Sequence, residues 1–497
     1  MWSLLLFVII GLLGSNNSVN ALNCTVLPKG NPKFPKNFKF GVASSAFQIE
    51  GGWNADGKGP SIWDEYMHNN PDAIIDGSNA DDSVESYRLF DLDLKALKDL
   101  GVDHYRFSIA WPRIFPNGSV HLRNQKGIDY YNDVIDKLLA NGIEPIVTMF
   151  HWEMPVDIQK FGGFANSLIV EQFLDYAEEL FNLFGDRVKT WLTINEPNQL
   201  CKSGYSMALG PPLIRAKGVG EYICFTNVLK AHGATYRMYR EKFYEKQRGR
   251  LSLPCNVNYM YSKTNSTDEV ARAMDYEFGI LAHPIFSKSG DFPPIVLKDI
   301  EKNSLAEGRK KSRLPSLGKY WTSVIKGSFD FLALNYYTAW PIESSTEPIG
   351  DNPSYERDSN FVVGTFTHCP QAKSNWLQFV PQGLEALLKY IRDTYDNVEV
   401  KILENGWSDA GGNDDYMRIE YHRNHLQAVV NAINDGCNVT SYAPWSLMDS
   451  FEYLKGYTEK FGFYAVNMTS PNKERTPKKS AYYYKKVIET KSLHHKV

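Results

Sequence analysis

The sequence predicts a single (β/α)8 barrel of the TIM type with long loop insertions, an α/β fold. Short apolar segments alternate eight times with longer amphipathic segments, which favours a parallel sheet closed on itself. The 497 residues exceed one average domain but suit a barrel that carries insertions. An open doubly wound sheet is the alternative, but it would normally bring a glycine-rich phosphate turn, and Gly51-Gly52 lacks the third glycine of that motif.

The apolar segments predict eight strands, because they are short, rich in β-branched and aromatic residues, and bounded by turn residues. These strands are expected at residues 38–46, 104–111, 143–151, 188–195, 251–260, 329–337, 398–404 and 439–445. Helices are expected at 91–100, 132–140, 168–184, 227–243, 270–281, 383–395, 417–433 and 481–489, where apolar residues recur at helical spacing. Segments 261–267 and 340–376 are rich in Ser, Pro, Asn and Asp, which predicts surface insertions that frame a cleft.

The N-terminus predicts a secretory signal peptide over residues 1–21, followed by one domain over residues 22–497. Its apolar run from Leu4 to Leu13 leads through small and polar residues to Ala21. No second apolar run is long enough to span a membrane, so a secreted protein, or one in the lumen of the secretory pathway, is expected. Sequons for N-glycosylation agree with that route and lie at Asn23, Asn117, Asn265, Asn438 and Asn467.

Composition excludes several function classes. The net charge is −3 and no basic run with interleaved aromatics is present, so nucleic acid is not expected as a partner. Six cysteines are few for this length, so one or two disulfides are expected, and the absence of a CxxC spacing gives no indication of a metal site.

Polar side chains stand on seven of the eight expected strands, mostly at the carboxyl ends, where barrels of this kind carry their chemistry. Packing alone does not explain them, because buried polar groups cost free energy unless they are paired. The candidates are Gln48 and Glu50, Arg106, His151 and Trp152, Asn195 and Glu196, Asn335 and Tyr337, Glu404, and Trp445 with Glu452 and Tyr453 beyond it.

Glu196 and Glu404, on strands four and seven, are expected to face each other across the barrel mouth. Two carboxylates flanking a sugar acetal are what glycosidic cleavage needs, since one protonates the leaving oxygen and the other attacks the anomeric carbon or activates water. Arg106 and the Tyr337 hydroxyl would keep Glu404 ionised, which suits a nucleophile. Glu196, in a more apolar surround, would have a raised pKa and suit a general acid. No cofactor is needed for this reaction.

The residues around both glutamates resemble glycoside hydrolase family one, the β-glucosidases. Asn195-Glu196-Pro197 and Ile402 to Gly406 look like the paired signature of that family. Further blocks that match in the same order lie at residues 38–51, 105–113, 150–155, 334–338 and 444–452. The resemblance covers nearly the whole mature chain.

The resemblance implies a retaining β-glycosidase that hydrolyses terminal β-D-glucosides through a covalent glycosyl-enzyme intermediate. It implies Glu196 as the acid/base and Glu404 as the nucleophile. It also implies a shell that binds the glycone, the sugar that is cleaved off, with Gln48, His151, Asn195, Trp445 and Glu452 as members. Chemistry supports these roles, because Gln48 and Glu452 can hold neighbouring hydroxyls, Asn195 can reach the 2-hydroxyl and Trp445 offers a platform for the sugar face.

Three departures from the family pattern bear on the substrate. Tyr453 stands where the family usually has Trp, which leaves glucose, galactose and fucose open. Lys202 is either a solvated lysine or a cation for an anionic aglycone, the leaving part of the substrate, such as the sulfated aglycone of a glucosinolate. Trp340, in place of a frequent arginine, suggests an apolar aglycone wall. A thioglucosidase and a catalytically silent carbohydrate-binding protein are therefore the alternative functions.

Overall fold

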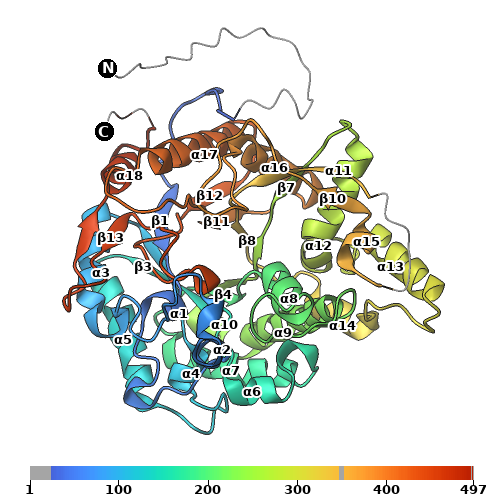
Figure 1. Cartoon of the computed structure of the whole chain (residues 1–497), viewed down its shortest axis with the longest axis horizontal. Helices are drawn as coiled ribbons and strands as arrows, with labels where there is room; N and C mark the ends of the chain where they lie inside the picture. The colour runs from blue at the N-terminus through green and yellow to red at the C-terminus, as the bar shows by residue number, and fades with distance from the viewer. Residues whose placement is uncertain (1–23, 346–351, 494, 496–497) are drawn as a thin grey trace.

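The computed structural model describes residues 24–345, 352–493 and 495. The expected signal peptide and the sequon at Asn23 lie outside the described residues. Figure 1 shows the strands gathered inside the molecule with the long helices outside them. Two disulfides, Cys24–Cys369 and Cys201–Cys224, confirm the expected number of bridges. Within the described residues, no helix is long and apolar enough to cross a membrane.

A parallel sheet forms the barrel, as the alternation of segments predicts. The strands pair in the order β5-β4-β3-β2-β1-β12-β11-β8-β6. Their bounds are β1 Lys39–Ala43, β2 His104–Ser108, β3 Glu144–Phe150, β4 Thr190–Ile194, β5 Arg250–Ser252, β6 Pro254–Asn256, β8 Leu332–Asn335, β11 Val400–Glu404 and β12 Val439–Tyr442. Each expected strand is found, but most are shorter than expected because the residues at their carboxyl ends turn into loops and short helices.

The expected fifth strand, 251–260, is wrong as one element. It is divided into β5, which pairs with β4, and β6, which pairs with β8, and these two halves close the barrel. Pro254 has no backbone N–H to continue a ladder. At the break between β5 and β6, the Ser252 hydroxyl bonds to the neighbouring segment instead. It donates to the Phe331 carbonyl oxygen at 2.8 Å and accepts from the Ala333 N–H at 3.2 Å.

Amphipathic helices cover the barrel from outside. The longer ones are α3 Ser86–Leu100, α5 Gln125–Ala140, α7 Ile169–Phe184, α9 Gly220–Lys242, α16 Pro381–Thr394, α17 Tyr416–Asn434 and α18 Lys479–Thr490. Short helices follow several strand ends, among them α1 Ala46–Ile49, α4 Trp111–Ile114 and α8 Pro197–Tyr205. Trp111 is packed as expected of a structural residue, because it is buried and its ring stacks on Tyr176 at 4.2 Å.

The insertions form a lobe beside the barrel, at the right of Figure 1. A second sheet joins β7 Tyr259–Ser262, β9 Ala339–Ser344 and β10 Phe361–Val363. Around it lie α11 Thr267–Met274, α12 Ile280–Phe286, α13 Pro294–Ala306, α14 Gly318–Ile325 and α15 Tyr355–Ser359. The expected helix 270–281 is interrupted by a π-helical turn, η5 Asp275–Gly279. Such turns are frequent at functional sites.

Candidate active site

The carboxyl ends of the barrel strands open into a cavity of about 430 Å³. Eleven residues singled out in the sequence line it: Gln48, His151, Trp152, Asn195, Glu196, Tyr337, Trp340, Glu404, Trp445, Glu452 and Tyr453. Arg106 and Asn335 lie beneath the cavity, fully buried, and bond to the two glutamates. The barrel therefore brings together residues that are up to 405 positions apart, from 48 to 453.

Glu404, at the end of β11, has a buried partner on each of its two carboxyl oxygens. The Arg106 guanidinium is ion-paired with Glu404 Oε1, and the Tyr337 hydroxyl donates to Glu404 Oε2 at 2.8 Å. Both partners stabilise the charged form, and both are buried. The two oxygens are thus fixed in direction, which suits an attacking group.

Glu196 follows β4 and has a positive φ of 45°, a conformation that turns the chain sharply from the strand into α8. Asn335 Nδ2 donates to Glu196 Oε1 at 2.8 Å, and Asn256 Nδ2 donates to the same oxygen at 3.3 Å. Burial, and to a lesser extent the negative charge of Glu404, raise the pKa of Glu196 to about 8. Glu196 therefore keeps its proton at neutral pH.

Asn195 links the two carboxylates to the sugar-binding side. Arg106 NH2 donates to Asn195 Oδ1 at 2.6 Å, so Asn195 Nδ2 faces His151 Nε2 at 3.2 Å. An amide nitrogen can only donate, so His151 Nε2 accepts and the ring is neutral. Burial, with the nearby Arg106 charge, holds the pKa of His151 well below its usual value. The His151 ring also stacks on Trp445, with centroids 5.8 Å apart.

Gln48 and Glu452 also line the cavity. Gln48 Nε2 donates to the Phe451 carbonyl oxygen at 2.8 Å, and Gln48 Oε1 accepts from the Ser45 hydroxyl at 2.8 Å. In the described chain Glu452 Oε1 is buried without a hydrogen-bond donor, and burial raises the pKa of Glu452 well above its usual value. A buried acceptor without a donor is the group that a substrate hydroxyl would satisfy.

Tyr453 belongs to an aromatic cluster at the rim. Its ring stacks on Phe47 at 5.9 Å and contacts Trp152 at 5.1 Å. Its hydroxyl lies 3.5 Å from the His151 carbonyl oxygen. The tyrosine therefore fills the place of a larger aromatic ring and is fixed by packing on both sides.

Lys202 is not part of the cavity lining. It lies on α8, where its Nζ is 3.2 Å from Glu277 Oε2 and 4.0 Å from the centre of the Tyr355 ring. Its positive charge is thus balanced by a buried carboxylate. The expected role toward an anionic aglycone stays a prediction that these contacts do not favour.

The mouth of the cavity contains residues that the sequence analysis missed. They are Gln199, Ser203, Asn256, Asn258, Trp376, Lys455, Glu459 and Phe461, next to the expected Trp340. A signal existed for two of them, because positions 199 and 203 are four apart on a helix that starts at Pro197 and so share one face. Asn256 and Asn258 are two apart, which is the spacing of one face of an extended chain.

Comparison with known proteins agrees with this geometry. The sequence profile described as glycosyl hydrolase family 1 matches residues 31–493. The chain belongs to this family. It is 40% identical over 464 residues to Myrosinase 1 of Brevicoryne brassicae, with 92% of this chain and 99% of that protein covered. It is 39% identical over 467 residues to the cytosolic beta-glucosidase of Homo sapiens, with 93% and 99% covered.

Solved structures of family 1 enzymes superpose closely on the chain. Aphid myrosinase gives a TM-score of 0.89 at 38% identity, covering 93% of this chain and all of that one. A rice beta-glucosidase gives 0.86 at 35% identity, covering 93% and 99%, and a variant of it was solved in a covalent complex with Glc. The predicted (β/α)8 barrel and the interpretation as a glycoside hydrolase are confirmed by these relationships.

Proposed function

We propose that the protein is a retaining β-glycosidase that hydrolyses terminal β-D-glucosides. The presence at one cavity of Glu404, ion-paired with Arg106, and of Glu196, whose pKa is raised, carries this proposal, since it matches what the two half-reactions need. The rice beta-glucosidase variant in covalent complex with Glc supports the same route. A silent carbohydrate-binding protein would not need both carboxylates in these two states.

In the first half-reaction Glu404 attacks the anomeric carbon while Glu196 gives its proton to the leaving oxygen. Arg106 and Tyr337 orient Glu404 and hold its charge until the bond forms. Arg106 also holds Asn195, whose amide can bond the 2-hydroxyl of the sugar. The products of this step are the free aglycone and a glycosyl ester on Glu404.

In the second half-reaction Glu196 takes a proton from water, which attacks the glycosyl ester. The change of role follows from electrostatics, because esterification removes the Glu404 charge that raises the pKa of Glu196. Its pKa then falls, and the residue that was an acid becomes a base. No metal or organic cofactor takes part in this scheme.

The test is hydrolysis of 4-nitrophenyl β-D-glucoside, with the anomer of the released sugar followed by NMR. The β-anomer should form first, and no release of sugar by folded protein from any aryl β-glycoside would rule out the proposal. Because Glu196 must be protonated in the free enzyme, kcat/KM should fall as pH rises above about 8, the pKa of Glu196. A basic limb several pH units away would remove Glu196 as the acid.

A thioglucosidase is the second candidate, since Myrosinase 1 of Brevicoryne brassicae is among the sequence relatives and aphid myrosinase is among the similar structures. The contacts of Lys202 with Glu277 and Tyr355 speak against a sulfated aglycone, because the lysine charge is already balanced. A direct comparison of a glucosinolate with a neutral aryl glucoside decides between them. Faster turnover of the glucosinolate would favour the thioglucosidase.

We further propose that the protein enters the secretory pathway and carries N-linked glycans. The expected signal peptide over residues 1–21 supports this, and so do the exposed positions of the sequons at Asn265, Asn438 and Asn467, whereas Asn117 is half-buried. Expression in a eukaryotic secretory host should give protein in the medium whose mass falls on treatment with an N-glycanase. Retention inside the cell without glycans would contradict this.

A further inference from the structure

A buried carboxylate, Glu277, contacts Asn258, which lines the mouth of the cavity. Glu277 belongs to the π-helical turn η5 and is 5% exposed, and it does not itself line the cavity. Its Oε1 accepts a hydrogen bond from Asn258 Nδ2 at 3.0 Å, and its Oε2 lies 3.2 Å from Lys202 Nζ. The reaction scheme above uses none of these three residues.

Lys202 serves Glu277 as a counter-ion. Removing a carboxylate from water costs several kcal/mol unless an opposite charge and hydrogen bonds compensate it. The Lys202 ammonium supplies the charge, and the Tyr355 ring, 4.0 Å from Nζ, holds the ammonium from its other side. The lysine is therefore turned toward the protein and not toward a substrate.

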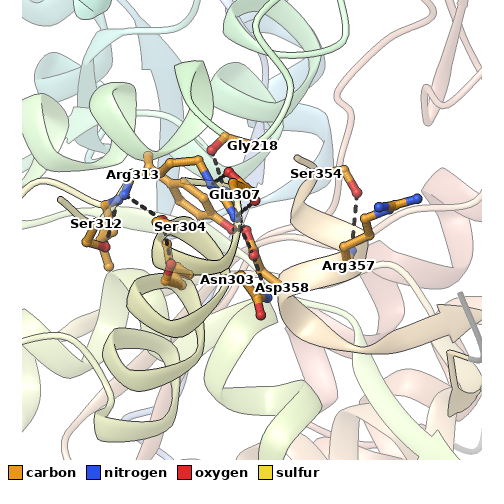
Figure 2. A network of polar contacts seen from close by, with 12 residues as sticks. Gly218, Asn303, Ser304, Glu307, Ser312, Arg313, Ser354, Arg357 and Asp358 are labelled. Carbon is orange, nitrogen blue, oxygen red and sulfur yellow. Dashed lines mark hydrogen bonds and ion pairs between the residues drawn. The ribbon is translucent and has the colours of Figure 1, made fainter. Parts of the chain in front are cut away.

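Tyr355 is fixed because α15 is bonded both to the lobe, through Asn303 and Arg313, and to α9, through Tyr222. Figure 2 shows Asp358 of the same helix meeting Arg313 and Asn303. Arg313 NH1 and NH2 donate to the Asp358 carboxylate at 2.7 and 2.6 Å, and Asn303 Nδ2 donates to it at 2.9 Å. Tyr222, on α9, adds a fourth donor at 2.6 Å. With four donors and 1% exposure, Asp358 holds α15 in one position.

This arrangement decides which atom Asn258 offers to the cavity. A carboxylate only accepts hydrogen bonds, so the amide nitrogen of Asn258 must face Glu277. The amide oxygen of Asn258, Oδ1, is then the atom that does not face Glu277. No donor in the described residues contacts Asn258 Oδ1, and Asn258 lines the cavity. The cavity wall therefore presents a hydrogen-bond acceptor at this point.

We propose that Glu277 is a positioning residue that sets aglycone preference through Asn258. The preferred substrates are glycosides with a neutral aglycone that carries hydroxyl groups, such as a second sugar. A hydroxyl can donate to Asn258 Oδ1, whereas an anionic group would meet an acceptor there. The charges of Lys202 and of Lys455, the lysine that lines the cavity, are already balanced by Glu277 and Glu459. Trp340 and Trp376 also line the cavity, and their indole faces suit the apolar face of a sugar ring. This inference rests on the proposed function.

The experiment compares kcat/KM for cellobiose with kcat/KM for phenyl β-D-glucoside, whose aglycone has no hydroxyl group. Glu277→Leu removes the acceptor at similar volume and should lower the ratio of cellobiose to phenyl glucoside about 5- to 10-fold, the value of one hydrogen bond. Glu277→Gln keeps an acceptor for Asn258 and should retain most of the ratio. The inhibition constant of glucose, which reports on the glycone side, should stay within about twofold.

Asn258→Ala provides a second route if Glu277→Leu does not fold. It removes the acceptor itself and should lower the same ratio by a similar factor, and the double variant should show no further loss, because both changes remove one contact. Glu343→Gln is the matched control, since Glu343 is an exposed ion-pair partner of Lys263 in the same lobe. It should leave the ratio unchanged.

Three results would overturn the inference. Glu277→Leu could lower kcat/KM for both substrates by one common factor, Asn258→Ala could leave the ratio unchanged, or the unmodified enzyme could cleave phenyl glucoside but not cellobiose. Each leaves the proposed function intact, because the unmodified enzyme would still be a β-glucosidase. The proposed function fails only if the unmodified protein cleaves neither substrate nor any other aryl β-glycoside.

Discussion

The floor and the mouth of the cavity are built in different ways. On the floor, Glu404 ends a barrel strand and Glu196 lies two residues beyond the end of another, and buried partners fix both carboxylates. At the mouth, Trp340 and Trp376 come from the long insertion between β8 and β11. Strands connected by a closed ladder cannot shift singly, whereas a loop changes without disturbing the barrel.

This difference separates the chemistry from the choice of substrate. The floor determines how a glycosidic bond is cut, and a change there should affect every substrate. In the proposed reaction the mouth meets the aglycone, which leaves in the first half-reaction, so a change there should affect substrates unequally. Substitutions on the two sides can therefore be told apart by kinetics.

Loss of the nucleophile should have the largest effect. Glu404→Gln removes the charge that attacks the anomeric carbon, so turnover of all β-glucosides should fall by at least about 10⁴-fold. Steady-state kinetics on aryl glucosides measures this, with Glu399→Gln as control because Glu399 lies at the opposite end of the barrel strands, paired with Arg250. Unchanged hydrolysis by Glu404→Gln would exclude it as the nucleophile.

Loss of the acid should depend on the leaving group. Glu196→Gln should lower kcat/KM by about 10² to 10⁴ for cellobiose, whose leaving oxygen needs a proton. The aglycone of 2,4-dinitrophenyl glucoside leaves as a stable anion without a proton. The first half-reaction of this substrate should therefore be far less affected. The ratio between the two substrates measures the proton transfer. An equal loss on both would mean that Glu196 acts in some other way.

Truncation at the mouth should have a smaller and selective effect. Trp376→Ala removes an indole that contacts the Tyr337 ring at 5.5 Å and lines the cavity. It should raise KM for aryl glucosides about tenfold, the contribution of one aromatic contact with its buried area. The inhibition constant of glucose should not move. A matching loss of glucose binding would show that the mouth and floor are not separable.

Much of the floor could be predicted from the sequence. A carboxylate at a strand end, repeated on two strands of a barrel, must lie at the same rim, so Glu196 and Glu404 required only the count of strands. Gln48, His151 and Trp445 followed by the same rule. The rule does not give the depth of a residue below the cavity. The contact of Arg106 with Glu404 was expected and is found, but the bond from the buried Asn335 to Glu196 was not predicted.

The mouth could not be predicted to the same extent, because its residues are placed by tertiary contacts. Lys202 is an example, since its position six residues after Glu196 suggested a substrate contact. Glu277, 75 positions further along, instead draws it away from the cavity. Nothing in local spacing reveals a partner at that distance. Asn256 and Asn258 were missed because a single fifth strand was expected where the chain makes two short ones and a break.

The smallest expected effect concerns stability and tests the floor without substrate. The pKa of Glu196 is about 8 in the folded protein, above its ordinary value. Between the two values the folded chain keeps a proton that the unfolded chain loses, so the free energy of unfolding decreases as pH rises through this window. Glu196→Gln removes this penalty. Its Tm should equal that of the unmodified protein near pH 4 and exceed it by about 2 to 5 °C near pH 8.

Thermal unfolding of both proteins from pH 4 to pH 8 measures this difference. Glu343→Gln serves as the control, because Glu343 is an exposed ion-pair partner and should show no such pH dependence. A Tm difference for Glu196→Gln that stays constant with pH would mean that Glu196 ionises normally in the folded protein. The floor would then lack the asymmetry between its two carboxylates, and the assignment of acid and nucleophile would have to rest on position alone.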